Sequence, residues 1–276
     1  MEKGLDLQGL KSSIANESVP KRGKAVVHLT YDNGYGAYHV LVSALPLTAP
    51  FLPQLRNGEM LAFFHTGQAL VAPVLSFLGV AQSAFFPPAE PPLAQPYHFC
   101  APRLHFELGT RPQYPRAHFV QSHLRDLRRA LEPPPNRPCV PKPQGIVVLA
   151  RGNSSHAPSN EAAMATALGG LGRAVTVLDV EATPFPRLLE VLGSAAVLVS
   201  AHGTQLANMV FAPEGAKVVE VVPQMVFGVL DFHFRDLAGS LNFTYVPFGQ
   251  EVKVEGQHLQ LSRDLERLRD QVASLL

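Results

Sequence analysis

The stretch that decides the fold is residues 197–222, VLVSAHGTQLANMVFAPEGAKVVEVV. The apolar run Val197–Val199 predicts a buried strand that ends at the small-residue loop SAHGT, residues 200–204. A short helix is expected next, and the Pro-Glu-Gly sequence at 213–215 predicts a turn into a second apolar strand, Val218–Val222. This order of elements places backbone N–H groups at a helix N-terminus, where an anion can bind. Because the loop also carries a histidine that can neutralise an anion, the stretch predicts a site for a phosphate-bearing ligand.

The rest of the chain indicates an α/β protein with two halves. We expect two Rossmann-like domains, residues 24–132 and 144–276, because strand and helix patterns alternate on both sides of the proline-rich linker EPPPNRPCVPKP, residues 132–143. The expected strands are 24–30, 59–64, 145–149, 174–179 and 195–199, and the expected helices are 38–52, 68–78, 116–131, 159–170, 185–192 and 262–276.

Composition narrows the class of protein. The net charge is +1, and the basic cluster RDLRR, Arg125–Arg129, is interpreted as a solvated helix face, so we expect no nucleic-acid partner. No apolar stretch reaches the roughly 18–20 residues of a membrane helix, and residues 1–25 show no signal peptide. Membrane association is therefore expected only if an anchor precedes this chain. Cys100 and Cys139 are compatible with one disulfide but do not establish it.

Three polar loops carry the candidate site residues. His202, Gly203 and Thr204 form the loop described above; the alternative is a capped helix with a partly buried histidine. Arg151 follows the strand 145–149, where an arginine suits phosphate recognition; the alternative is a surface arginine.

The loop that begins at Arg151 holds two more candidates, and the third loop, residues 31–39, holds one. Asn160 and Glu161 begin the next helix, and helix capping explains them without a ligand. His39 follows a glycine-containing loop and is a candidate general base; the alternative is a structural histidine.

Several chemistries are excluded by the motifs they require. The chain contains no G-x-S-x-G, H-E-x-x-H, Walker A or G-x-G-x-x-G sequence. It also lacks a D-x-D pair that would hold a divalent ion against a diphosphate. We therefore expect no metal and no cofactor, and a diphosphate held by arginine, histidine and helix N-terminal amides.

At these residues the chain resembles glycosyltransferase family 61, the DUF563 region. The family signature H-G-A-x-L-[TS]-N is matched by His202-Gly203-Thr204-Gln205-Leu206-Ala207-Asn208, and F-x-P-x-G-x-x-V-[IV]-E by residues 211–220, which end in Glu220. Upstream, R-x-x-x-R-x-x-x-N-E is matched in residue type at Arg151, Asn160 and Glu161, with one more intervening residue than the pattern has and without its second arginine. The N-terminal pattern N-x-x-H-x-x-x-D is echoed from Asn33 to His39, with Ser43 at the acidic position.

The resemblance implies a fold and an activity. It implies a GT-B fold, in which two Rossmann-like domains face a cleft and the C-terminal helix packs back across them. The implied activity is inverting transfer of xylose, arabinose or N-acetylglucosamine from a UDP-sugar to a glycan or glycoprotein hydroxyl, without an essential metal. The implied location is the Golgi or ER lumen. A non-catalytic sugar- or nucleotide-binding relative is the alternative, because the second arginine and the acid at position 43 are missing.

The resemblance also assigns roles to residues. Arg151, His202 and the amides of Gly203 and Thr204 would stabilise the departing diphosphate. Asn208 would brace the loop, and Glu220 would lie at a strand end within reach of the nucleotide. Since Ser43 replaces the family's acid, Asp32 or His39 would have to serve as the base.

Overall fold

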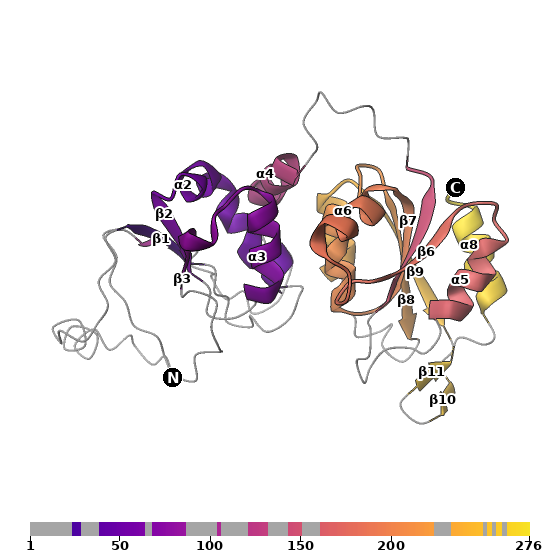
Figure 1. The fold of residues 1–276 in the computed structure, drawn as a ribbon. Helices are drawn as coiled ribbons and strands as arrows, with labels where there is room; N and C mark the ends of the chain where they lie inside the picture. The colour runs from indigo at the N-terminus through magenta and orange to yellow at the C-terminus, as the bar shows by residue number, and fades with distance from the viewer. Residues whose placement is uncertain are drawn as a thin grey trace.

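The computed structural model describes residues 24–28, 39–63, 68–86, 104–105, 121–131, 143–150, 161–223, 233–250, 253–255, 258–260 and 264–276. The first half holds a parallel sheet in the order β3-β2-β1-β4 (Figure 1). Its elements are β1 (Ala25–His28), η1 (His39–Ala44), η2 (Leu45–Phe51), α2 (Leu52–Arg56), β2 (Met60–Phe63), α3 (Gln68–Phe77), η3 (Gln82–Ala84), β3 (Phe85–Phe86), β4 (Leu104–His105) and α4 (Gln121–Leu131). The predicted strand 59–64 and helix 68–78 are confirmed within a residue.

The predicted helix over residues 38–52 is wrong in type. The chain instead forms the π-helix η1, continues as the 3₁₀ helix η2 and becomes α-helical only in α2. Proline has no N–H to donate and its ring clashes with the preceding turn, so Pro46 and Pro50 disfavour a regular α-helix here. The hydroxyl of Thr48 stabilises the tighter turn by donating to Leu45 O at 2.7 Å.

The second half holds a five-stranded parallel sheet in the order β6-β5-β7-β8-β9. Its elements are β5 (Gly145–Ala150), α5 (Glu161–Gly169), β6 (Val175–Asp179), α6 (Phe185–Gly193), β7 (Ala195–Ala201), the 3₁₀ helix η4 (Thr204–Phe211), β8 (Lys217–Pro223), α7 (His233–Ser240), β9 (Thr244–Gln250), the hairpin β10 (Lys253–Glu255) and β11 (His258–Gln260), and α8 (Leu265–Ala273). The α/β class with parallel sheets is confirmed. The sequence reading missed α7, β9 and the hairpin.

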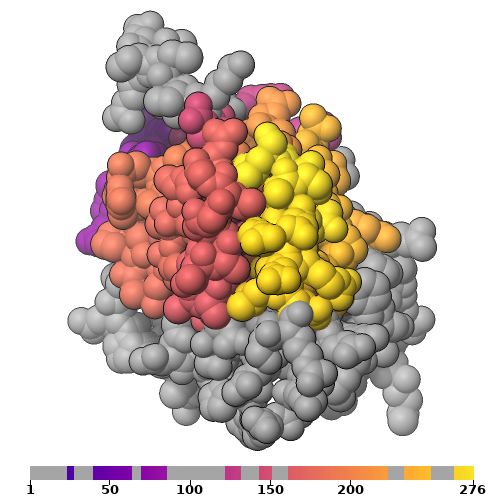
Figure 2. All heavy atoms as spheres, turned by 90° about the vertical axis from the view of Figure 1, so that its right-hand side faces the viewer, coloured from indigo at the N-terminus to yellow at the C-terminus, as the bar shows by residue number. Residues whose placement is uncertain are grey.

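Two helical layers cover this sheet, on opposite sides (Figure 1). On the outer side, Met164 of α5 and Leu268 of α8 pack on Ile146, Val197 and Val219. The last helix was expected to pack back across both halves; instead α8 lies beside α5 on this outer face (Figure 2). Its apolar stripe covers sheet surface that α5 alone leaves open, which explains this position.

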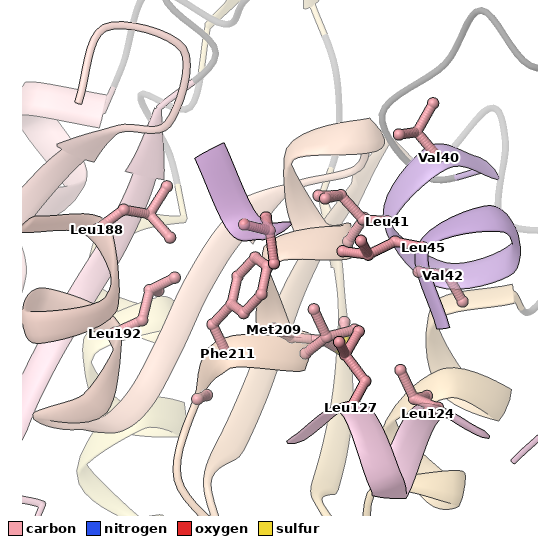
Figure 3. Close-up of a cluster of buried hydrophobic side chains, with 14 of the residues drawn as sticks. Val40, Leu41, Val42, Leu45, Leu124, Leu127, Leu188, Leu192, Met209 and Phe211 are labelled. Atoms are coloured by element: carbon pink, nitrogen blue, oxygen red, sulfur yellow. The ribbon is translucent and has the colours of Figure 1, made fainter. Parts of the chain in front are cut away.

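On the inner side of the sheet, the two halves share one apolar core. Leu41 of η1 and Leu127 of α4 belong to the same buried cluster as Met209 of η4 and Leu188 of α6 (Figure 3). Aromatic side chains extend it, since Phe185 makes edge-to-face contacts with Phe77 on one side and Phe211 on the other. The first half therefore packs on the helical layer formed by α6 and η4.

One arginine of the basic cluster crosses this boundary. Arg128 donates from Nη2 to Ala212 O at 3.0 Å, and its guanidinium carbon lies 5.1 Å from the centre of the Phe243 ring. Arg125 and Arg129 are exposed. The predicted solvated face is thus correct for these two residues and wrong for Arg128.

Among the described helices, none combines the length and apolar character needed to cross a membrane. The linker 132–142 lies outside the described residues.

Candidate functional site

The site lies where the second sheet reverses its strand order. The chain forms β5, moves to β6 at one edge, and returns to place β7 on the other side of β5. Ligands of open parallel sheets bind at the carboxyl ends of the two strands that flank such a reversal. Those ends are Ala150, after which Arg151 follows, and Ala201, after which His202 follows. The carboxyl ends of β5 and β7 therefore lie side by side, with Leu149 paired to Ser200, and the loop that carries His202 begins at this edge of the sheet.

The side chain of Gln205 holds the loop after β7 in place through hydrogen bonds. This side chain is 3% exposed, and its Nε2 donates to Ala201 O at 2.8 Å and to Ser200 Oγ at 3.1 Å. The amide oxygen of Gln205 is held so close to Gly203 that a Cβ there would lie 2.4 Å from it. Asn208 braces the next turn, since its Nδ2 donates to Gln205 O at 2.9 Å. Gly203 is thus required by the packing of this loop.

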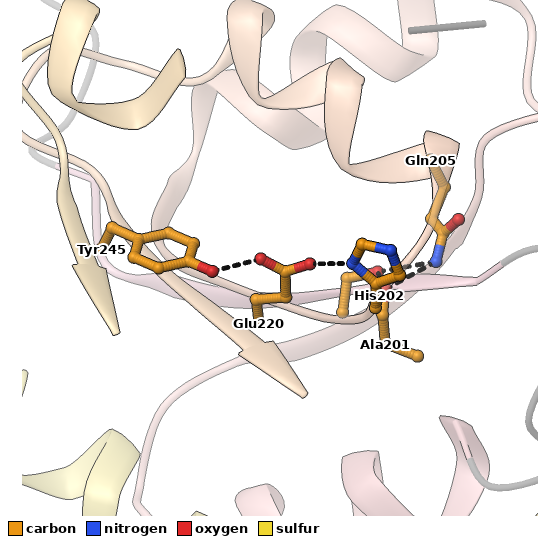
Figure 4. A network of polar contacts seen from close by, with 6 residues as sticks. Ala201, His202, Gln205, Glu220 and Tyr245 are labelled. Carbon is orange, nitrogen blue, oxygen red and sulfur yellow. Dashed lines mark hydrogen bonds and ion pairs between the residues drawn. The ribbon is translucent and has the colours of Figure 1, made fainter. Parts of the chain in front are cut away.

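A chain of three polar side chains runs across the sheet at this end (Figure 4). His202 Nδ1 lies 2.5 Å from Glu220 Oε1, and Tyr245 donates its hydroxyl to Glu220 Oε2. In register, Ser200 of β7 pairs with Glu220 of β8, so His202, two residues on, lies on the same face as the carboxylate. Glu220 was expected within reach of the nucleotide. It is 2% exposed, and its two oxygens contact His202 and Tyr245, so the structure shows it holding His202, and its reach to a nucleotide stays a prediction.

The surroundings make Glu220 an acceptor on both sides. Burial, followed by the hydrogen bond to Glu220, raises the pKa of Tyr245 far above its ordinary value, although the charge of Arg235 opposes the shift. Tyr245 is therefore a protonated donor at all physiological pH values. A carboxylate only accepts hydrogen bonds, so the contact of its other oxygen with Nδ1 assigns a hydrogen to Nδ1 and leaves Nε2 as the second ring nitrogen. The side chain of His202 is 36% exposed and its ring packs edge-on against Phe234.

The predicted site residues separate into two groups. The structure brings together His202, Gly203, Thr204, Asn208 and Glu220 on the segment from β7 to β8. Glu161 begins α5 with a half-buried side chain. Asp32, Arg151 and Asn160 lie outside the described residues. For His39 the structure describes only its place as the first residue of η1, an element that contacts η4.

Sequence reasoning missed Gln205 and Tyr245. The signal for Tyr245 was the β-branched and aromatic residues at the start of Thr244–Gln250, TYVPFGQ, which are typical of a strand. No group of three or more histidine, cysteine, aspartate or glutamate side chains gathers as a metal site among the described residues.

Comparison with known proteins identifies the class. Residues 37–219, about two thirds of the chain, match the family model for glycosyltransferase 61, which spans the loop after β7 and the beginning of β8. The chain therefore belongs to the glycosyltransferase 61 family, which places it among the glycosyltransferases.

Particular relatives are named as one kind of transferase. The chain is similar to protein O-linked-mannose beta-1,4-N-acetylglucosaminyltransferase 2 of Takifugu rubripes, at 34% identity over 39% of this chain, and of Tetraodon nigroviridis, at 33% over 41%. It covers about a fifth of the length of these relatives, 19% and 20%. Among solved structures, the chain is matched to a flavodiiron core from Synechocystis over 56% of this chain and 40% of that structure, at 15% identity. The TM-score of this match is 0.34, which is too low to support a fold argument.

Proposed function

We propose that the chain transfers a sugar from a UDP-sugar to a hydroxyl group, with inversion at the anomeric carbon. The observation that carries this proposal is the pair His202–Glu220 at the carboxyl end of β7, beside the reversal of strand order. A buried carboxylate holds one ring nitrogen, so the other is free to face a ligand in the crevice. A half-exposed histidine held in this way suits a diphosphate, which accepts hydrogen bonds and carries negative charge.

In the proposed reaction the acceptor hydroxyl oxygen attacks the anomeric carbon from the face opposite the diphosphate. The bond between that carbon and the diphosphate oxygen breaks, and its electron pair leaves with UDP. With the ligand bound, His202 would be the imidazolium, donating from Nδ1 to Glu220 and from Nε2 to the diphosphate, while the amides of Gly203 and Thr204 donate to the same oxygens as this charge develops. Arg151 would add a bidentate contact from the neighbouring loop. The acceptor's proton would pass to a base on the first half, for which Asp32 and His39 are the candidates.

The proposal extends to the remaining residues and to the partners. Asn160 and Glu161, at the start of α5, would line the nucleotide site, and no metal or cofactor takes part. Because the relatives are named as N-acetylglucosaminyltransferases acting on O-linked mannose, we favour UDP-N-acetylglucosamine over UDP-xylose and UDP-arabinose, and a mannosyl glycoprotein as acceptor. On the family resemblance, we propose the Golgi or ER lumen as the location of this reaction.

We further propose a GT-B arrangement with the donor on the second half. Each half has its own parallel sheet, which supports two Rossmann-like units over residues 24–132 and 144–276. The acceptor would then lie on the side of η1, whose first residue is His39.

Calorimetric titration with UDP tests the nucleotide site. The unaltered chain should bind UDP, and His202→Ala and Arg151→Ala should each weaken binding and lower turnover of UDP-N-acetylglucosamine with a mannoside acceptor at least tenfold, about 1.4 kcal/mol. Arg129→Ala, an exposed change on α4, is the matched control and should bind as the unaltered chain does. Unchanged affinity and turnover in both site variants would refute the assignment.

A second candidate is a non-catalytic relative that binds the nucleotide sugar only. It is favoured by Ser43, which replaces the family's acid and is 3% exposed on η1, with a hydroxyl that makes no hydrogen bond to the part of the chain that the structure describes. Because Ser43 supplies no carboxylate, the base of a transfer reaction would have to be another residue. UDP binding without turnover across a broad panel of sugar acceptors would select this candidate, whereas turnover with any acceptor would eliminate it.

A further inference from the structure

Tyr245 reaches the site from a strand that carries none of the predicted site residues. It lies on β9, paired in register with Val218 of β8, and Glu220 is two residues further along β8 on the same face. Such diagonal neighbours on adjacent strands lie within reach of an aromatic side chain. The ring therefore lies along the sheet surface, and its hydroxyl meets Glu220 Oε2 (Figure 4).

The contact matters because Glu220 is buried and has two oxygens to satisfy. A buried carboxylate oxygen without a donor costs free energy, and the side chain or its partner rearranges to avoid that cost. Tyr245 supplies the donor for Oε2, which leaves Oε1 for His202 Nδ1. Without the tyrosine hydroxyl, Oε2 would lose the donor that the described residues give it, and the carboxylate would turn to recover one, which loosens its contact with His202 Nδ1.

We propose that Tyr245 is a positioning residue of the nucleotide site: by holding one oxygen of Glu220, it sets which nitrogen of His202 carries the proton and which one faces the ligand. With Nδ1 protonated toward Glu220, Nε2 points outward. This inference rests on the proposed function for its ligand, but its statement about His202 concerns the chain alone. Tyr245 itself touches no reacting atom.

The test is Tyr245→Phe, which removes one oxygen and keeps the ring. Nitrogen-15 spectra of histidine-labelled chain should show His202, identified by the signal lost in His202→Gln, with Nδ1 protonated in the neutral ring. In Tyr245→Phe this signal should move toward a mixture of the two tautomers. The dissociation constant for UDP should rise about three- to tenfold, and the melting temperature should fall because a buried hydrogen bond is lost.

Two variants complete the design. Glu220→Gln removes the charge from the same chain of contacts and should displace the His202 signal in the same way. Ser194→Ala removes a hydroxyl that donates to Val191 O at the far end of α6, and it should leave both the spectrum and UDP binding unchanged. A His202 signal unaffected by Tyr245→Phe, or a changed signal with unchanged UDP affinity, overturns the proposal. Failure of the unaltered chain to bind UDP refutes the proposed function instead, and the spectrum then decides by itself whether Tyr245 sets the state of His202.

Discussion

Replacing Gly203 by alanine tests how tightly the loop after β7 is packed. The added carbon would lie 2.4 Å from Gln205 Oε1 and 3.1 Å from its Nε2, closer than real methyl groups approach an oxygen. Gln205 is a long side chain, but its Nε2 bonds to Ala201 O and Ser200 Oγ hold it in place. Relieving the contact means giving up at least one of these buried hydrogen bonds. Leaving a buried polar group unpaired costs about 1–3 kcal/mol, and the free energy of unfolding should fall by this amount.

A double-mutant cycle isolates the contact. Denaturant unfolding is measured for the unaltered chain, Gly203→Ala, Gln205→Ala and the double variant. Because Gln205→Ala removes the atoms that the methyl group would strike, the double variant should lose about 1 kcal/mol less than the two single losses together. Gly193→Ala, where nothing lies within 4 Å of the added carbon, is the control and should cost little. Additive losses, within about 0.5 kcal/mol, would refute the reasoning.

Three more perturbations probe the interface, the outer face and the polar chain. Arg128→Met removes a hydrogen bond and a ring contact between the two halves and should lower the free energy of unfolding by about 1–3 kcal/mol. Arg129→Met, which breaks an exposed ion pair, should change this free energy by less than about 0.5 kcal/mol. Equal losses in the two variants would contradict the role of Arg128. Leu268→Ala, in the buried stripe of α8, should cost about 2–5 kcal/mol in the same assay, and a cost below about 1 kcal/mol would mean that α8 is not docked. Burial and its carboxylate partner raise the pKa of Tyr245 above the ordinary 10.0. The folded chain therefore keeps a proton that the unfolded chain loses, and stability should fall as pH rises above about 10. Tyr245→Phe should show a shallower fall in alkaline unfolding curves, and identical slopes would contradict the shifted pKa.

The central strands were predictable because of how a parallel sheet is buried. Strands covered on both faces read as continuous apolar runs, and β5, β7 and β8 each have one. β9 was harder to recognise because it contains Pro247. A proline is tolerated there because β9 lies at the edge of the sheet, where the missing N–H has no strand to bond.

The end of α7 shows a different limit. Asn242, the asparagine of an N-x-T sequence, adopts a left-handed conformation with φ of 59°. The backbone N–H of Asn242 donates to Gly239 O, and that of Phe243 donates to Ala238 O. This is the pattern of a helix C-cap, a position where glycine is the commonest residue and asparagine also occurs. Asn242 therefore fits both the N-x-T sequence and the left-handed C-cap of α7. The sequence alone does not tell which of the two accounts for the asparagine.

The site was predicted by residue type and only partly by arrangement. His202 and Glu220 were both singled out, but as separate ligands of the nucleotide. Their contact depends on the register that pairs Ser200 with Glu220, and register between strands is set by packing across the whole sheet. Gln205 was not singled out because its role depends on the space beside Gly203, which no spacing of residues reveals.

The 3₁₀ helix η4 has a thermodynamic consequence of its own. It begins at Thr204 in the loop and is buried from Gln205 to Phe211 in the core that both halves share. Ligand binding at the loop and the packing of the two halves against each other are therefore linked through one segment, η4. Linkage is reciprocal: to the extent that a bound ligand tightens the packing around η4, tighter packing raises the affinity for that ligand by the same factor. Substitutions at Met209, which is buried in the shared core rather than in the loop, thus belong among those that tune binding.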